Sequence, residues 1–179
     1  MNKNAQARKF ARSLIESIEN ETDLDVVQRE LAEISEVLKT NSGLLNFFLN
    51  PGVPSERKEK ALDEILEKMG SSIITKSFMS ILFRKRGIAL LPEIAEQFLS
   101  FVDIASNRVR AEVIVAETLD ESESLLIKKK LSEITGKEVV VNICEDLSII
   151  GGAITKIGSL VVDGSIRTQL RIARNKLMS

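Results

Sequence analysis

The chain has 179 residues, of which 44% are hydrophobic and 28% are charged, and its formal net charge is −1. This composition is typical of a soluble globular protein. The sequence has no run of roughly 20 apolar residues, the length that spans a bilayer. The near-neutral charge argues against general nucleic-acid affinity, which needs a basic excess. The chain has no His, so the commonest acid–base catalyst and metal ligand is missing, and we expect no cofactor and no metal.

The N-terminal part predicts about six helices, because apolar residues recur there at the three- and four-residue spacing of one helix face. The first helix is expected from Ala5 to Glu19, and Thr22 with Asp25 resembles a capping box that opens the second. The others are expected to begin near Ser42, Ser55, Ser72 and Pro92. Together they predict an all-α bundle.

The composition changes near residues 103–108. All seven Phe residues lie at or before Phe101, all three Pro residues precede position 93, and the later sequence is richer in Val, Ile and Gly. Two differently built cores are therefore expected, in domains spanning residues 1–104 and 105–179.

The second part alternates between strand and helix patterns, which predicts a small α/β domain. Strands are expected at Val109–Val115, Lys137–Cys144, Ala153–Ile157 and Leu160–Val162. A helix capped by Asp120 and Glu123 should end at Gly136 and pack through Leu126, Leu131 and Ile134, and a last helix should follow Ser165.

The last predicted helix carries two stripes. Ile166, Leu170, Ala173 and Leu177 share one face, and Arg167, Arg171 and Arg174 share the opposite one. In one interpretation the apolar face covers the small sheet and the arginines are solvated. In the other, the basic face also meets an acidic partner.

No pattern in the chain predicts catalysis. Gly158 is followed by Ser159 and Leu160 rather than by the Lys-Ser or Lys-Thr of a phosphate-binding loop, so turn chemistry explains the glycines better. Cys144 has no His to activate it, and an unpaired thiol is typical of an intracellular protein. Arg84-Lys85-Arg86 fits a capped helix end, with an ionic partner contact as the alternative.

The segment Leu147–Leu177 resembles the C-terminal signature of the delta subunit of F-type ATP synthases, whose mitochondrial counterpart is the oligomycin-sensitivity-conferring protein. The matching positions, which we expect to maintain the fold, are Gly151, Gly152, Gly158, Asp163, Gly164, Ser165 and Arg167. The N-terminal segment ARKFARSL also resembles the first helix of that family.

This resemblance implies a non-catalytic stator connector between the catalytic head and the peripheral stalk. The family's six-helix bundle binds the N-terminal helix of an alpha subunit in a groove between its first and fifth helices. The corresponding positions here are Phe10, Ser13, Val27, Ser77 and Ile81. The C-terminal domain is expected to bind the b subunits, and the protein to reach the cytoplasmic face of the bacterial plasma membrane only through the complex.

An alternative from another functional class is an RNA-binding or antitermination-type adaptor. Small helical bundles serve in such proteins, and the basic last helix could contact phosphates. The near-neutral charge and the long C-terminal signature weigh against it.

Overall fold

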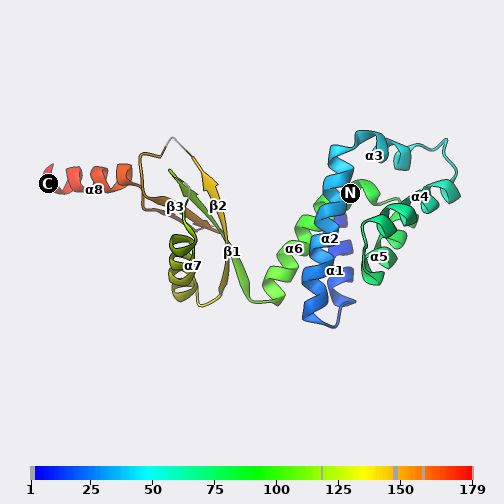
Figure 1. The fold of residues 1–179 in the computed structure, drawn as a ribbon, viewed down its shortest axis with the longest axis horizontal. Helices are drawn as coiled ribbons and strands as arrows, with labels where there is room; N and C mark the ends of the chain where they lie inside the picture. The colour runs from blue at the N-terminus through cyan, green and yellow to red at the C-terminus, as the bar shows by residue number, and fades with distance from the viewer. Residues whose placement is uncertain (1–2, 118, 147–148, 159, 179) are drawn as a thin grey trace. The chain divides into compact units, whose positions relative to one another are not determined.

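The computed structural model describes residues 3–117, 119–146, 149–158 and 160–178, and the chain divides into two compact units, Met1–Val102 and Asp103–Ser179 (Figure 1). The first unit is helical, and the second contains a small mixed sheet with helices. A helical region followed by a small α/β region is the predicted fold class.

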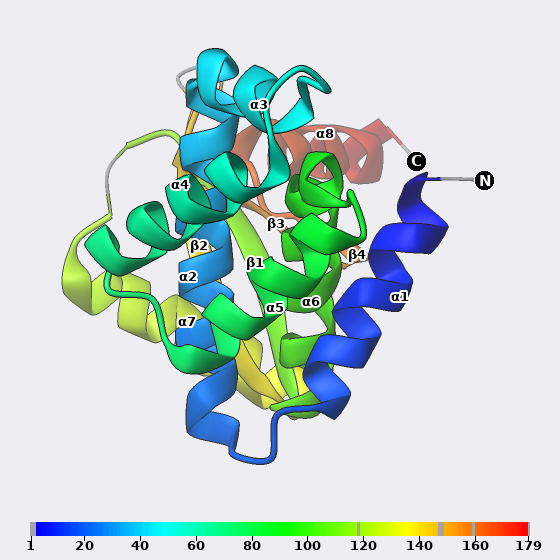
Figure 2. The same cartoon turned by 90° about the vertical axis from the view of Figure 1, so that its right-hand side faces the viewer.

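The first unit encloses one apolar core. Its elements are α1 (Lys3–Glu16), α2 (Glu21–Thr40), α3 (Ser42–Leu49), α4 (Ser55–Lys68), α5 (Ile73–Arg84), the short 3₁₀ helix η1 (Ile88–Leu90) and α6 (Leu91–Ala105), whose last turn belongs to the second unit. The helices bury most of the apolar residues that recur at helical spacing, although Ile81 of α5 is exposed. Figure 2 shows the helices from the side of α4 and α5. Leu31, Leu82 and Phe98 are among the fully buried side chains of this core.

Two predicted helix ends need correction. Helix α1 ends at Glu16 rather than Glu19, because the N–H and the hydroxyl of Ser17 both donate to the Leu14 carbonyl, at 3.1 and 2.7 Å, and close the last turn. Helix α2 begins at Glu21 after Asn20, so Thr22 lies inside its first turn and cannot form the predicted capping box with Asp25.

The second unit is built around strand β1. The strands are β1 (Arg108–Val115), β2 (Glu138–Glu145), β3 (Ala153–Ile157) and β4 (Leu160–Asp163), in the order β2-β1-β3-β4. Strands β1 and β2 are parallel and joined through α7 (Glu121–Thr135), whereas β3 runs antiparallel to both β1 and β4. Ala111, Val113 and Val115 are buried on one face of β1, and with Val139 of β2 they form the core of this unit.

Helix α7 begins and ends as predicted but packs differently. Its capping box between Asp120 and Glu123 is present, and Gly136 ends it in the left-handed conformation. Leu126 and Ile134 are 58% and 74% exposed, so only Leu131 of the predicted packing residues is half-buried. The helix packs against β2, as Figure 1 shows.

Helix α8 (Ile166–Met178) does not cover the sheet, and that part of the prediction is wrong. Ile166 and Leu170 of the predicted apolar face are 41% and 63% exposed, and Ala173 is also exposed. The side chain of Leu177 lies outside the described residues. Periodicity identifies which residues share a face, but it cannot tell whether the same chain covers that face.

Within residues 3–117, 119–146, 149–158 and 160–178, every helix is too short or too polar to cross a bilayer.

Candidate functional site

Helix α5 presents one buried and one exposed face. Thr75, Phe78, Met79 and Leu82 point into the core. Ile73, Ser77 and Ile81, which follow one another at four-residue spacing, form the exposed face, where Ile73 is 82% and Ile81 54% exposed. Exposed isoleucines in such a row favour contact with an apolar partner rather than with water.

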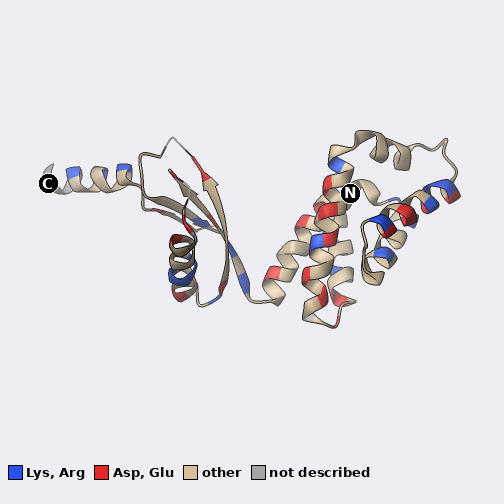
Figure 3. Ribbon diagram, in the orientation of Figure 1, with Lys and Arg blue, Asp and Glu red and all other residues tan. Residues whose placement is uncertain are grey.

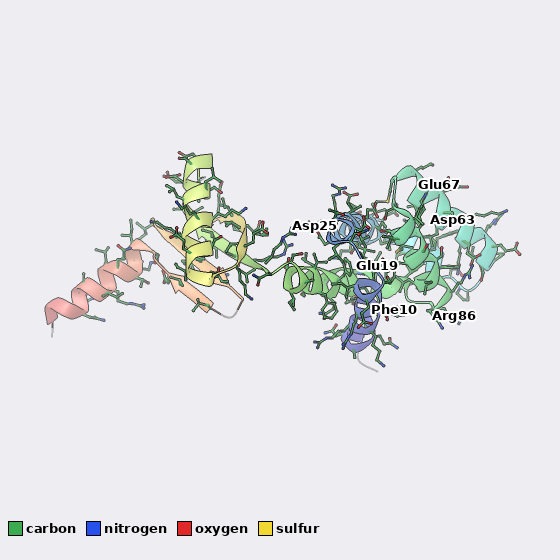
Figure 4. The ribbon with its side chains drawn as sticks, turned by 90° about the horizontal axis from the view of Figure 1, so that it is seen from below. Phe10, Glu19, Asp25, Asp63, Glu67 and Arg86 are labelled. Atoms are coloured by element: carbon green, nitrogen blue, oxygen red, sulfur yellow. The ribbon has the colours of Figure 1, made fainter. Side chains whose placement is uncertain are left out.

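Helix α1 contributes the other predicted contact residues. Ala7, Ala11 and Leu14 bury its inner face, whereas Phe10 is half-buried beside the core and Ser13 is exposed. Figure 4 labels Phe10 on this helix. We call Phe10, Ser13, Ile73, Ser77 and Ile81 together the α1–α5 surface.

The prediction for Val27 needs correction. This side chain is fully buried in the core of the first unit, so it has no surface to offer a partner. Ile73 was missed by sequence reasoning, although its spacing from Ser77 and Ile81 was the available signal. Ile73 and Ile74 are adjacent at the start of α5. Because Ile74 fits the core-facing stripe, the sequence alone did not distinguish the exposed Ile73 from it.

The signature glycines join strand β3 to the beginning of α8. Gly164 N–H donates to the Ala153 carbonyl, and Ile166 N–H donates to the Gly151 carbonyl, both at 2.9 Å. Gly152 has φ +79°, and a Cβ there would lie 2.5 Å from the Gly164 carbonyl oxygen. Only glycine fits this close approach of two backbone segments.

Asp163 and Ser165 cap α8. The Asp163 carboxylate accepts from Ser165 N–H at 2.9 Å and from the Thr168 hydroxyl at 2.7 Å, while the Ser165 hydroxyl accepts from Thr168 N–H at 3.3 Å. Hydrogen bonds from Ser165 and then Thr168 lower the pKa of Asp163 from 3.8 to about 2. The signature thus fixes where the last helix starts, and Arg167 follows on its exposed first turn.

The end of the second unit exposes both apolar and basic side chains. Leu160, Val161 and Val162 of the edge strand β4 are 51–58% exposed, and Leu170 and Ile172 of α8 are 63% and 49% exposed. Arg171 and Arg174 are exposed on the same helix, where Figure 3 shows basic residues without an acidic one. We call β4 and α8 together the β4–α8 surface.

The described residues offer no group of three Cys, Asp or Glu side chains that could hold a metal ion. Cys144 is half-buried in β2, with its Sγ 3.8 Å from Glu112 Oε1. The two candidate sites are the α1–α5 surface and the β4–α8 surface.

Comparisons with known proteins agree on one family. Residues 7–177 match the family model described as ATP synthase delta (OSCP) subunit. The chain is 38% identical over 170 residues to ATP synthase subunit delta of Geotalea uraniireducens, covering 95% of this chain and 94% of that protein, and 35% identical to that of Desulfosudis oleivorans, covering 95% and 93%. A chain in the solved Toxoplasma gondii mitochondrial ATP synthase hexamer shares the fold, with a TM-score of 0.65, 15% identity and 97% coverage of both chains.

Proposed function

We propose that this chain, which belongs to the ATP synthase delta (OSCP) subunit family, holds the catalytic head through its first unit and the stalk b subunits through its second. Family membership establishes the coarser role, a stator link at the peripheral stalk of the F-type ATP synthase. The RNA-binding adaptor gains no support, because the described matches are to ATP synthase subunits.

The observation that carries the proposal is that each compact unit exposes apolar side chains, Ile73 and Ile81 on α5 in the first and those of β4 and α8 in the second. Rotary catalysis requires that the head not turn with the central rotor. A connector must therefore bind the head and the stalk at once and transmit the reaction torque. Two partner surfaces meet this need without any catalytic group, so we infer a non-catalytic subunit.

The α1–α5 surface suits the amphipathic N-terminal helix of an alpha subunit. Such a helix presents apolar side chains every three or four residues, which matches the row formed by Ile73, Ser77 and Ile81 on α5. Nanomolar binding corresponds to about 12 kcal/mol, and a few well-buried anchors can supply most of it. In this proposal α1 to α6 act as one six-helix bundle, with α1 and α5 as the binding helices.

The β4–α8 surface suits the b subunits of the stalk. Its exposed apolar side chains favour burial against a protein partner, and the arginines of α8 favour a partner that carries acidic residues. We infer that the protein lies at the cytoplasmic face of the bacterial plasma membrane and is held there by its partners.

A charge at Ile81 tests the α1–α5 surface. The substitution Ile81→Asp should weaken binding of a synthetic alpha N-terminal peptide by about 2–4 kcal/mol, because an apolar anchor is lost and a carboxylate is desolvated. Binding is measured by isothermal titration calorimetry on the full chain, and circular dichroism verifies that the variant is folded.

Ile104→Asp is the matched control, because Ile104 is 75% exposed on α6 and lies outside the α1–α5 surface. This control should bind the peptide like the wild type. Wild-type affinity in folded Ile81→Asp protein contradicts the proposed alpha-subunit site.

A further inference from the structure

The first unit contains a hollow whose lining includes no residue of the α1–α5 surface. It lies among α3, the α3–α4 connection, the start of α4 and the end of α5, and has a volume of about 480 Å³. This volume is within the range of roughly 300–1,000 Å³ typical of ligand pockets. Phe48, Phe83 and Ile88 supply apolar lining. The rings of Phe48 and Phe83 pack edge to face, with their centroids 6.4 Å apart.

A buried ammonium group lines this hollow. Lys58 is only 8% exposed, and its Nζ donates to the Asn50 carbonyl at 2.7 Å. No carboxylate lies within 4.0 Å of it among the residues that the structure describes. An ammonium has three N–H donors, and a buried charge is costly without an opposite charge nearby. Lys58 therefore favours an anionic group in the hollow.

Arg84, which ends α5, and Arg86, in the turn after it, add positive charge to the same lining. Arg84 Nε lies 3.6 Å from Glu59 Oε1, which is a long ion pair between exposed side chains. Arg86 forms no hydrogen bond or ion pair through its side chain in the described part of the chain. The lining thus carries three cations and one carboxylate, in a chain whose net charge is −1.

The backbone at Arg86 limits which anion fits. Arg86 has φ +56°, where Gly is usual, and its N–H donates to the Phe83 carbonyl at 2.8 Å while Gly87 N–H donates to the Leu82 carbonyl at 2.9 Å. These bonds occupy the backbone donors of the turn. The turn therefore offers no nest of free amides of the kind that holds phosphate, and its attraction for anions comes from side chains.

We infer that this hollow binds an acidic peptide segment of a partner protein, with an apolar side chain against Phe48 and Phe83 and carboxylates beside Lys58, Arg84 and Arg86. Apolar lining with a cationic rim complements a peptide that alternates acidic and apolar residues. Figure 4 labels Arg86 at the end of α5 and Asp63 and Glu67 on α4, toward the opposite side of the unit in that view. Their carboxylates are absent from the lining of the hollow.

The test is a titration of the full chain with a fluorescein-labelled peptide in which Glu residues surround a central Phe-Leu pair. A second peptide has Gln in place of every Glu. We expect the acidic peptide to bind at low salt, to weaken at high salt, and to bind more tightly than the Gln peptide. Its binding should shift the amide resonances of Gly52 and Gly87, which adjoin the hollow, in a heteronuclear NMR spectrum.

A pair of variants within one cationic triplet provides the control. Arg86→Asn removes a charge from the lining and keeps a residue that tolerates positive φ, so affinity should fall about fivefold, the effect of one partly exposed charge pair. Lys85→Gln removes a neighbouring charge that is not part of the lining. It should change affinity less than twofold, because an exposed charge that does not contact the peptide contributes little to binding.

The inference is overturned if Lys85→Gln and Arg86→Asn weaken binding equally, if the Gln peptide binds as well as the acidic one, or if neither binds. Displacement of the peptide by ATP or inorganic phosphate at equal concentration also overturns it, because the hollow is then a phosphate site. Ile81→Ser, which adds no charge three residues before Arg84, should leave this binding unchanged, so the outcome is independent of the alpha-subunit proposal.

Discussion

Two glycines of the C-terminal signature are required for different physical reasons. Gly152 combines φ +79° with a backbone oxygen 2.5 Å from where a Cβ would lie, whereas Gly158 has φ +57° and open space around it. A side chain at Gly152 must therefore move the strand β3 away from the start of α8. At Gly158 only the backbone conformation resists substitution.

Gly152→Ala should lower the free energy of unfolding of the second unit by about 2–4 kcal/mol, since steric overlap is added to backbone strain. Gly158→Ala is the matched control and should cost about 1 kcal/mol. Hydrogen exchange at the β3 amides measures both effects in the full chain. Equal costs for the two variants contradict the role assigned to the Gly152–Gly164 contact.

Asp163 should make the cap of α8 dependent on pH. Its pKa is lowered from 3.8 to about 2 by hydrogen bonds from Ser165 and Thr168, so the ionised form is the one that stabilises the fold. This stabilisation is fully present above pH 3.8 and is lost as the pH falls through about 2. Asp163→Asn should therefore increase exchange of the first α8 amides above pH 3.8 and have little effect near pH 2.

Carbon-detected NMR titration of the Asp163 carboxyl gives the pKa directly. Asp120 is a useful comparison in the same spectrum, because hydrogen bonds within its capping box also lower its pKa. An unshifted Asp163 rules out the proposed cap energetics.

At the scale of elements, one of the two capping boxes predicted from local sequence is present, at Asp120 in α7, and the other, at Thr22 in α2, is not. The capping box of α7 depends on Asp120 and Glu123 alone, and the sequence was sufficient to predict it. The exposure of Leu126 on α7 and of Leu170 on α8 depends on what else the chain places against them. Val27 was assigned to the partner surface by the family resemblance, and the structure places it in the core instead.

One long-range contact that sequence reasoning missed joins α2 to the start of α5. The Glu30 carboxylate accepts from the Ser72 N–H at 2.8 Å and from its hydroxyl at 2.7 Å, while that hydroxyl accepts from Thr75 N–H. Glu30 and Ser72 are 42 positions apart, so no local sequence pattern predicts this contact. The carboxylate also lies at a helix N-terminus, where negative charge is favourable.

Glu30→Gln should lower the free energy of unfolding of the first unit by about 1–2 kcal/mol, because a charge-assisted pair of hydrogen bonds is replaced by a weaker neutral one. Thermal unfolding followed by circular dichroism measures the change. Glu33→Gln, at an exposed position of the same helix, should be nearly neutral. A similar loss in both variants would indicate a general charge effect instead of this contact.

At the scale of the whole molecule, the proposed function gives each compact unit its own partner. The first unit has its own apolar core, so a fragment ending at Val102 should fold and still bind the head. It lacks the β4–α8 surface, which is the proposed stalk contact, and should therefore fail to hold the stalk. The fragment thus separates attachment to the head from transmission of torque.

Reconstituting stripped membranes with this fragment should preserve ATP hydrolysis by the head and abolish proton-driven ATP synthesis. The full chain is the control and should restore both activities. Circular dichroism of the fragment verifies that it is folded. Full coupled synthesis with the fragment refutes the two-surface proposal, and loss of hydrolysis points to a catalytic contribution.

The open edge at β4 has a consequence for the biogenesis of the complex. Leu160, Val161 and Val162 are exposed on a strand that, among the described residues, pairs on one side only. Such an edge can template pairing with another copy of the same chain. If the proposed stalk partner covers this edge, a newly made subunit is vulnerable to aggregation until that partner binds, and matched synthesis of the two proteins would limit the risk.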